Sequence, residues 1–138
     1  MSFSEKISPL LGRLALAWFF LGAAMDAINH WHSTIGYLSD HNIPAAPLML
    51  VFALICIFLG SFSLILGFHT RHGAVLLFGF TLVVSVAMHA FWRIDDPAAR
   101  AAEFEIFARN IAIAGGLLLM VGMGPGPFAI DNPGKGKR

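Results

Sequence analysis

Five polar side chains lie inside or at the edge of long apolar segments and could together form a reactive site. They are Asp26, His30, His89, Arg109 and Asn110. Asp26 and His30 are four residues apart, which places them on one face of a helix. Ionisable groups in apolar segments are energetically costly, so each is a candidate for function. Together they offer groups that exchange protons, a permanent cation and an amide that both donates and accepts hydrogen bonds.

Four long apolar segments must position these residues. Of the 138 residues, 57% are hydrophobic and 12% are charged, and the mean hydropathy is +0.75. A helix of roughly 20 apolar residues spans a bilayer. No Asp, Glu, Lys or Arg occurs between Asp40 and Arg71, between Arg71 and Arg93, or between Arg109 and Asp131. We therefore predict an all-α integral membrane four-helix bundle, a single domain over residues 1–138, with spans at about 8–30, 46–67, 72–92 and 103–123.

The connections between the spans predict their order in space. Residues 31–45 are rich in Ser, Gly, Asn, Asp and Pro, which predicts a link made of turns. Residues 67–73 form a short link, so the second and third spans should be antiparallel neighbours. Residues 93–97, Arg-Ile-Asp-Asp-Pro, supply acidic residues and a proline suited to starting the last helix.

Two stripes of small residues recur at helical spacing and predict close packing between helices. The stripe on the second span is Cys56, Gly60, Ser63 and Gly67. The stripe on the last span is Ala108, Ala112 and Gly115 or Gly116.

Residues at matching depth on facing sides of an antiparallel bundle converge, so we expect the five polar residues to form one pocket near the outward leaflet. Three interpretations are open. In the first, the pocket is structural: Asp26 pairs with Arg109, while His89 and Asn110 form hydrogen bonds across helices. In the second, a quinone or similar amphiphile binds its head group there, His89 and Asp26 exchange protons, and His30, Trp92, Arg109 and Asn110 contact the ligand. In the third, His30, His32 and His89 hold a metal ion or haem.

The composition of the chain limits the classes of partner and cofactor that it can bind. The net charge of +1 and the lack of a clustered basic face argue against nucleic acid, and the lipid bilayer is the expected environment. No glycine fingerprint for a flavin or nicotinamide is present, and Cys56 is the single cysteine, which rules out an iron–sulfur cluster held by this chain alone. A redox reaction would therefore require a partner redox protein or a bound haem. The chain is also expected to associate either with such a protein or with a second copy of itself. A non-catalytic scaffold subunit that binds a protein or lipid is the alternative.

The chain resembles the DoxX family of small four-span membrane proteins over nearly its whole length. Six segments carry the resemblance: residues 13–17 (Arg-Leu-Ala-Leu-Ala), 42–47 (Asn-Ile-Pro-Ala-Ala-Pro), 66–71 (Leu-Gly-Phe-His-Thr-Arg), 89–92 (His-Ala-Phe-Trp), 107–110 (Phe-Ala-Arg-Asn) with 114–117 (Ala-Gly-Gly-Leu), and 124–131 (Gly-Pro-Gly-Pro-Phe-Ala-Ile-Asp). The resemblance implies an inner-membrane bundle. It also implies kinship with the membrane subunits of quinone-linked thiosulfate oxidation and with an oxidant-defence membrane complex.

The polar positions that match the family are His89, Trp92 and Asn110, together with Arg109, where relatives more often have lysine. Two positions depart from the family pattern. Ile57 stands where relatives often carry a glutamate, and Asp26 follows the position where they often carry a lysine. The missing glutamate removes a proton carrier that the family resemblance would otherwise imply.

We predict that both termini are cytoplasmic. The expected terminal side carries six of the nine Lys and Arg residues, and positive residues favour the cytoplasm. They are Lys6, Arg13, Arg71, Lys135, Lys137 and Arg138, against Arg93, Arg100 and Arg109 on the other side. A reporter fused after Arg138 should be active only in its cytoplasmic form, and activity of a periplasmic reporter would reverse the orientation.

Overall fold

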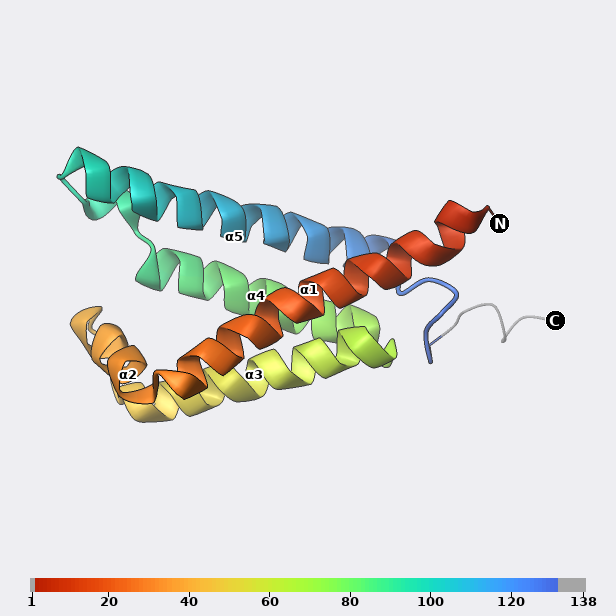
Figure 1. The fold of residues 1–138 in the computed structure, drawn as a ribbon, viewed down its shortest axis with the longest axis horizontal. Helices are drawn as coiled ribbons and strands as arrows, with labels where there is room; N and C mark the ends of the chain where they lie inside the picture. Colours follow the sequence, from red (N-terminus) through yellow and green to blue (C-terminus); the bar gives the residue numbers. More distant parts are fainter. Residues whose placement is uncertain (1, 132–138) are drawn as a thin grey trace.

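The computed structural model describes residues 2–131, which contain helices and no strands (Figure 1). The elements are α1 (Phe3–Asn29), α2 (Trp31–Asp40), α3 (Ala46–Leu66), α4 (Thr70–Met88), the short 3-10 helix η1 (Phe91–Arg93) and α5 (Pro97–Met123). Four segments are long and apolar enough to cross a membrane: Phe3–Asn29, Ala46–Leu66, Thr70–Arg93 and Pro97–Met123. The predicted all-α bundle with four spans is confirmed.

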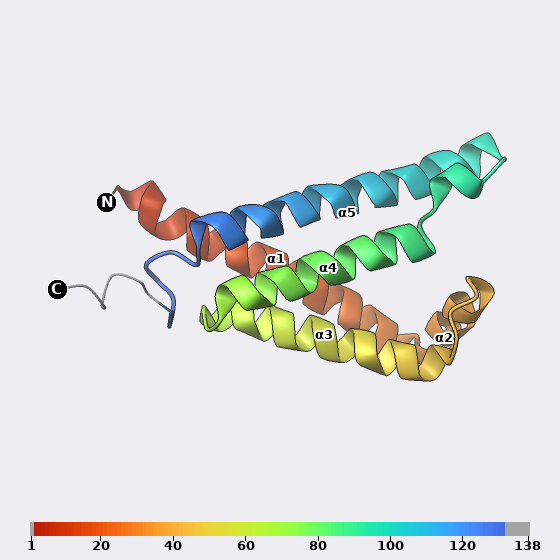
Figure 2. The same ribbon diagram turned by 180° about the vertical axis from the view of Figure 1, so that it is seen from behind.

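The four long helices form a bundle that is open along one side. α3 and α4 are antiparallel neighbours, α1 packs on α3, and α5 packs on α4, whereas α1 and α5 barely touch. A Cβ atom added to Gly116 of α5 would lie 3.8 Å from Leu16 of α1, which marks their place of close approach. Beyond it the two helices diverge toward the end that lies away from the termini (Figures 1 and 2).

Close packing of α3 on α4 follows the first predicted stripe of small residues. A Cβ atom on Gly60 would strike the side chain of Leu77, which is fully buried. One on Gly73 of α4 would likewise strike Ser63 of α3. This stripe is therefore confirmed as a packing surface.

The predicted stripe on α5 is a packing surface only at Gly116, which lies close to Leu16 of α1. Ala108, Ala112 and Gly115 are exposed on the outside of the bundle. The buried residues of α5 are Asn110, Ala114 and Leu117, which lie on another face of the helix. Spacing alone gave the period of the helix, but a 27-residue helix offers several faces with that period.

The predicted turn link after the first span is also wrong, because most of it is the helix α2. Trp31, Thr34, Ile35 and Leu38 are half-buried and recur at i, i+3, i+4 and i+7, the spacing of one helical face. That face packs against α3. Ser33, Gly36, Ser39 and Asp40 lie on the exposed side of α2, and the turns are confined to residues 41–45.

The start of α5 agrees with the predicted signal but comes earlier in the chain. Asp96 is the N-cap, and its carboxylate accepts a hydrogen bond of 2.9 Å from the Ala99 N–H. Pro97 occupies the first helical position, where its missing N–H costs nothing. The helix thus begins six residues before the predicted residue 103, and Glu103 lies inside it.

Residues 124–131, here called the C-terminal strap, cross the terminal end of the bundle. The guanidinium of Arg13, fully buried, donates to the carbonyl of Phe128. The strap also pairs with the α3–α4 turn: the Asp131 N–H donates to the Gly67 carbonyl at 2.8 Å, and the Asp131 carboxylate accepts from the Thr70 N–H at 2.9 Å. Gly67 has φ +66° and lies against Arg13, so a side chain here would be both strained and blocked.

We predict that Arg13→Met lowers the free energy of unfolding by about 2 kcal/mol, because a hydrogen bond to a charged group typically contributes this much to stability. Methionine keeps the apolar stem but leaves the Phe128 carbonyl without its donor. Thermal unfolding in detergent measures the change, with Arg100→Met, at an exposed position, as the control. Equal midpoints for both variants would show that Arg13 does not hold the strap.

Candidate functional site

A cavity of about 170 Å³ lies in the half of the bundle away from the termini, and we call it the α1–α5 cavity. Its walls are mainly aromatic and aliphatic, and its polar lining consists of Thr81, His89, Arg109 and Asn110. The complete lining is Phe19, Phe20, Ala23, Ile57, Phe80, Thr81, Val84, His89, Ile106, Arg109 and Asn110. Three of the five polar residues that the sequence predicted to converge therefore meet here.

Asn110 is the most deeply placed of these three residues. It is 8% exposed, and no hydrogen bond joins its amide to any other residue within 2–131. The nearby hydroxyls do not serve it: Thr81 donates to the Leu77 carbonyl at 2.7 Å, and Ser85 donates to the Thr81 carbonyl at 2.6 Å. The amide is therefore available to a ligand.

Arg109 lies at the open side of the cavity. Its guanidinium stands over the ring of Phe19, 5.7 Å from the centroid, and forms no ion pair within the described residues. A cation over an aromatic face is a weak interaction that leaves the N–H groups free to donate. The predicted pair between Asp26 and Arg109 is wrong: Asp26 lies 3.1 Å from His30 on its own helix.

His89 is held by Glu103, which the sequence prediction did not include. Its Nδ1 lies 2.8 Å from the Glu103 carboxylate, and the two side chains are 15% and 26% exposed. His89 itself caps α4 through an N–H bond of 3.1 Å to the Ser85 carbonyl. Burial and the negative charge of Glu103 together raise the pKa of Tyr37 on α2. Glu103 thus connects the cavity with the surface that α2 covers.

Asp26 and His30 belong to a separate, shallow hollow. It measures about 440 Å³ and is lined by Asp26, Ala27, His30, Ser33, Thr34 and Tyr37. The Asp26 and His30 side chains are 76% and 65% exposed. The expected single pocket of five residues is therefore two groups, three residues in the α1–α5 cavity and two beside it.

Neither Trp92 nor a metal cluster forms part of the cavity. Trp92 packs edge-on against Phe107, with ring centroids 5.7 Å apart, and does not line the cavity. His30 and His89 line different hollows, and residues 2–131 contain no group of three His, Cys, Asp or Glu side chains placed to hold a metal ion. The cavity is also far smaller than a porphyrin. The metal and haem interpretation therefore finds no site in this part of the chain.

Sequence reasoning missed Glu103 and the aromatic walls for different reasons. Glu103 is seven residues before Asn110, hence on the same helical face, so its spacing was a usable signal. The walls, Phe19, Phe20 and Phe80, are three of 13 phenylalanines in the chain. Nothing in their spacing separates them from phenylalanines that face lipid.

Fold and site define a multi-pass integral membrane protein with a polar-lined cavity among its spans. The DoxX family profile matches residues 8–90, and the profile of the SURF4 family matches residues 61–137. The inner membrane protein YqjF of Escherichia coli (strain K12) is 30% identical over 127 residues, covering 92% of each chain. The inner membrane protein YphA of the same organism is 28% identical over 128 residues, covering 93% of this chain and 91% of that one.

No solved structure matches this chain at a significant level. The chain belongs to the DoxX family, as its sequence segments predicted. Its spans and its relatives together identify an inner-membrane protein.

We predict that His89 and Glu103 are energetically coupled. In a double-mutant cycle with His89→Gln and Glu103→Gln, the coupling should be about 1–2 kcal/mol, because the pair is short and largely buried. The matched cycle with Asp26→Asn and Arg109→Gln should be additive, since these residues do not pair. Thermal unfolding measures both cycles. Additive effects in the first cycle would show that His89 and Glu103 do not interact. Coupling in the second cycle would show that Asp26 and Arg109 do interact.

Proposed function

We propose that this protein binds the head group of a quinone, or of a comparable lipid-soluble redox molecule, in the α1–α5 cavity and serves as a membrane component of a quinone-linked oxidoreductase system. The observation that carries the proposal is the amide of Asn110, which forms no hydrogen bond within residues 2–131 and belongs to a residue only 8% exposed, in a cavity that also holds Arg109 and His89. Ligand pockets are mostly apolar, with a few polar groups that fix orientation.

The size and the lining of the cavity fit one ring that bears carbonyl oxygens. An apolar cavity of about 150 Å³ in another protein holds benzene, and this one measures about 170 Å³. Phe19, Phe20 and Phe80 provide aromatic surface for the ring. Asn110 and Arg109 provide N–H donors for carbonyl oxygens, and the family resemblance to quinone-linked membrane subunits points to the same ligand class.

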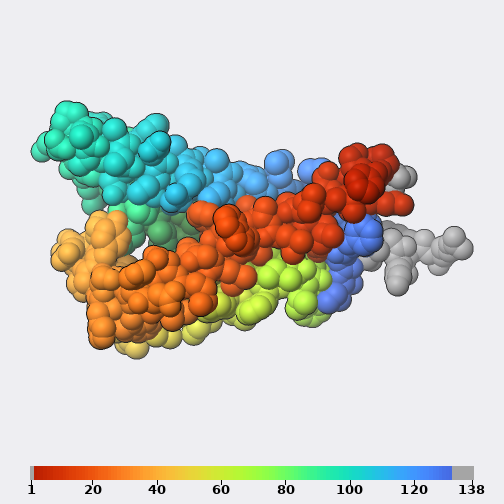
Figure 3. Space-filling model, viewed as in Figure 1, coloured from red at the N-terminus to blue at the C-terminus, as the bar shows by residue number. Residues whose placement is uncertain are grey.

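Access from the bilayer follows from the open side of the bundle. Arg109 is exposed where α1 and α5 diverge, and these two helices barely touch. In the space-filling view, the surface is hollowed between the outer part of α5 and the end of α1 with α2 (Figure 3). A lipid-soluble ligand would enter sideways between α1 and α5, and its tail would remain in lipid. If the termini are cytoplasmic, as predicted, the cavity lies in the outward half of the membrane.

In this proposal, His89 and Glu103 exchange protons with the bound ligand. Imidazole and carboxylate groups both bind and release protons, and Glu103 is 2.8 Å from the His89 ring and partly exposed to the surface. Asp26 and His30, assigned from the sequence to catalysis and ligand binding, lie outside the lining and keep no direct role. Because the chain has no flavin, nicotinamide or iron–sulfur motif, electrons would come from a partner redox protein.

Ligand retention tests the proposal. A short-chain ubiquinone or menaquinone analogue should raise the thermal midpoint of the detergent-purified protein. His89→Phe keeps the ring bulk without its nitrogens, and Asn110→Leu keeps the volume without the amide. We expect each variant to bind at least tenfold more weakly, because a lost hydrogen bond in a desolvated site costs about 1–3 kcal/mol.

The control variant is His32→Phe, whose side chain is exposed and lines neither hollow. It should bind the analogue as the wild type does. If His89→Phe and Asn110→Leu bind the analogue unchanged, or if the wild type does not bind it, the cavity is structural. The scaffold role is then the function to pursue.

A further inference from the structure

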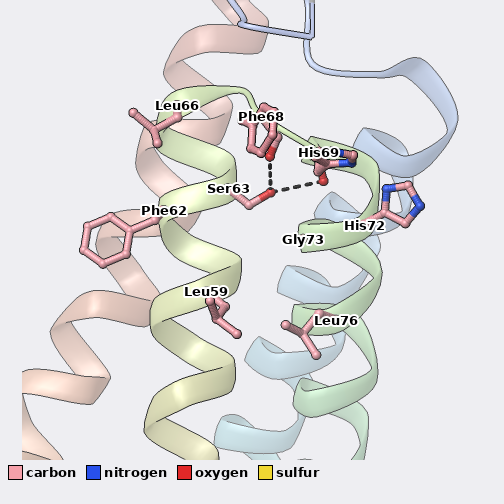
Figure 4. Close-up of a pocket in the computed structure, with 9 residues that line it drawn as sticks. All are labelled: Leu59, Phe62, Ser63, Leu66, Phe68, His69, His72, Gly73 and Leu76. Carbon is pink, nitrogen blue, oxygen red and sulfur yellow. Dashed lines mark hydrogen bonds between the residues drawn. The ribbon is translucent and has the colours of Figure 1, made fainter.

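A second hollow lies at the opposite end of the bundle, on the outside of the α3–α4 turn (Figure 4). It measures about 340 Å³, and its lower part lies between Leu59 and Leu76 on facing helices. Phe62, Leu66 and Phe68 extend its apolar surface, and all of these side chains are exposed on the outside of the bundle. We call it the α3–α4 groove.

The groove has a fixed floor. A Cβ atom on Gly73 would strike Ser63, so the two helices touch behind the groove. The Ser63 hydroxyl lies 2.7 Å from the Phe68 carbonyl and 3.1 Å from the His69 carbonyl, and bonds across the turn (Figure 4). The groove is therefore part of the packed α3–α4 pair and does not depend on a mobile loop.

Polar groups gather at the upper end of the groove, where α4 begins. His69 and His72 line the groove and also line an adjoining hollow of about 310 Å³ with Arg71. Asp131 is the acidic group there, and its carboxylate already accepts the Thr70 N–H. Arg71 has no carboxylate partner within residues 2–131. The end of the groove thus offers two imidazoles, with the permanent cation of Arg71 in the adjoining hollow.

We propose that the α3–α4 groove binds one anionic phospholipid. An acyl chain occupies the apolar part along Leu59 and Leu76, and the phosphate lies beside Arg71, His69 and His72. The positive charge of Arg71 and its place at the end of a membrane span support this occupant, because the phosphates of the bilayer lie at that level. Basic pockets between spans bind anionic head groups in other membrane proteins.

Native mass spectrometry of the detergent-purified protein tests the proposal with phosphatidylglycerol and phosphatidylcholine as probes. We expect one phosphatidylglycerol to be retained and phosphatidylcholine to be lost. Arg71→Gln should weaken phosphatidylglycerol binding about fivefold, the worth of one basic residue at a membrane surface. Leu59→Trp should fill the groove and abolish retention.

Two matched control variants separate the loss of this lipid site from a general effect of removing charge or adding bulk. Arg93→Gln removes an exposed arginine at the other end of the bundle, and Val83→Trp adds the same bulk on an exposed part of α4 outside the groove. Both should retain the lipid. Equal retention of the two lipids, or unchanged affinity in Arg71→Gln, would overturn the proposal. So would displacement of the bound lipid by inorganic phosphate at equal concentration, because the hollow would then be an anion site. If Leu59→Trp does not fold, Arg71→Gln decides.

Discussion

The lack of water inside a bilayer is the constraint on which this structure depends, because each polar group of a span must find its partner in the protein. Most of them do. Thr81 and Ser85 bond to carbonyls of their own helix, and Ser63 bonds across the α3–α4 turn. At the terminal end, Arg13 reaches the C-terminal strap, which in turn caps α4 through Asp131. Two segments that carried the family resemblance, near Arg13 and over residues 124–131, thus meet in space.

Some polar groups have no such partner. The buried hydroxyls of Ser61 and Thr70 and two guanidinium nitrogens of Arg13 form no hydrogen bond within the described part of the chain, and these residues lie away from the α1–α5 cavity. Two further residues without a side-chain hydrogen bond in this part of the chain lie together at the cavity. Asn110, 8% exposed, forms no hydrogen bond through its amide within residues 2–131, and the Arg109 guanidinium stands over the ring of Phe19. Both line the cavity where α1 leaves α5. The divergence has a structural cause: α1 leans on α3, and α2, which follows it directly, also packs on α3. The same arrangement that leaves polar groups unpaired therefore opens them toward lipid.

The sequence correctly predicted the features that depend on composition and local pattern. It did not predict the features that depend on which helices pack together. Four spans and the Asp96 cap follow from the residues present. α2 was missed because its Ser, Gly and Asp residues obscured the apolar face of Trp31, Ile35 and Leu38. The Asp26–Arg109 pair was expected from equal depth, but depth does not say that α1 and α5 separate. Of the site, His89, Arg109 and Asn110 were correctly brought together, while Glu103 was left out.

Photolabelling with a photoreactive quinone analogue tests the central claim most directly, because it reports where the head group lies. Mass spectrometry should find the label in residues 19–23 of α1 and 106–110 of α5, which form the two sides of the cavity opening. An excess of the unlabelled analogue should compete for these positions. Labelling confined to the outside of α3 and α4, or spread evenly over the spans and resistant to competition, would contradict the account.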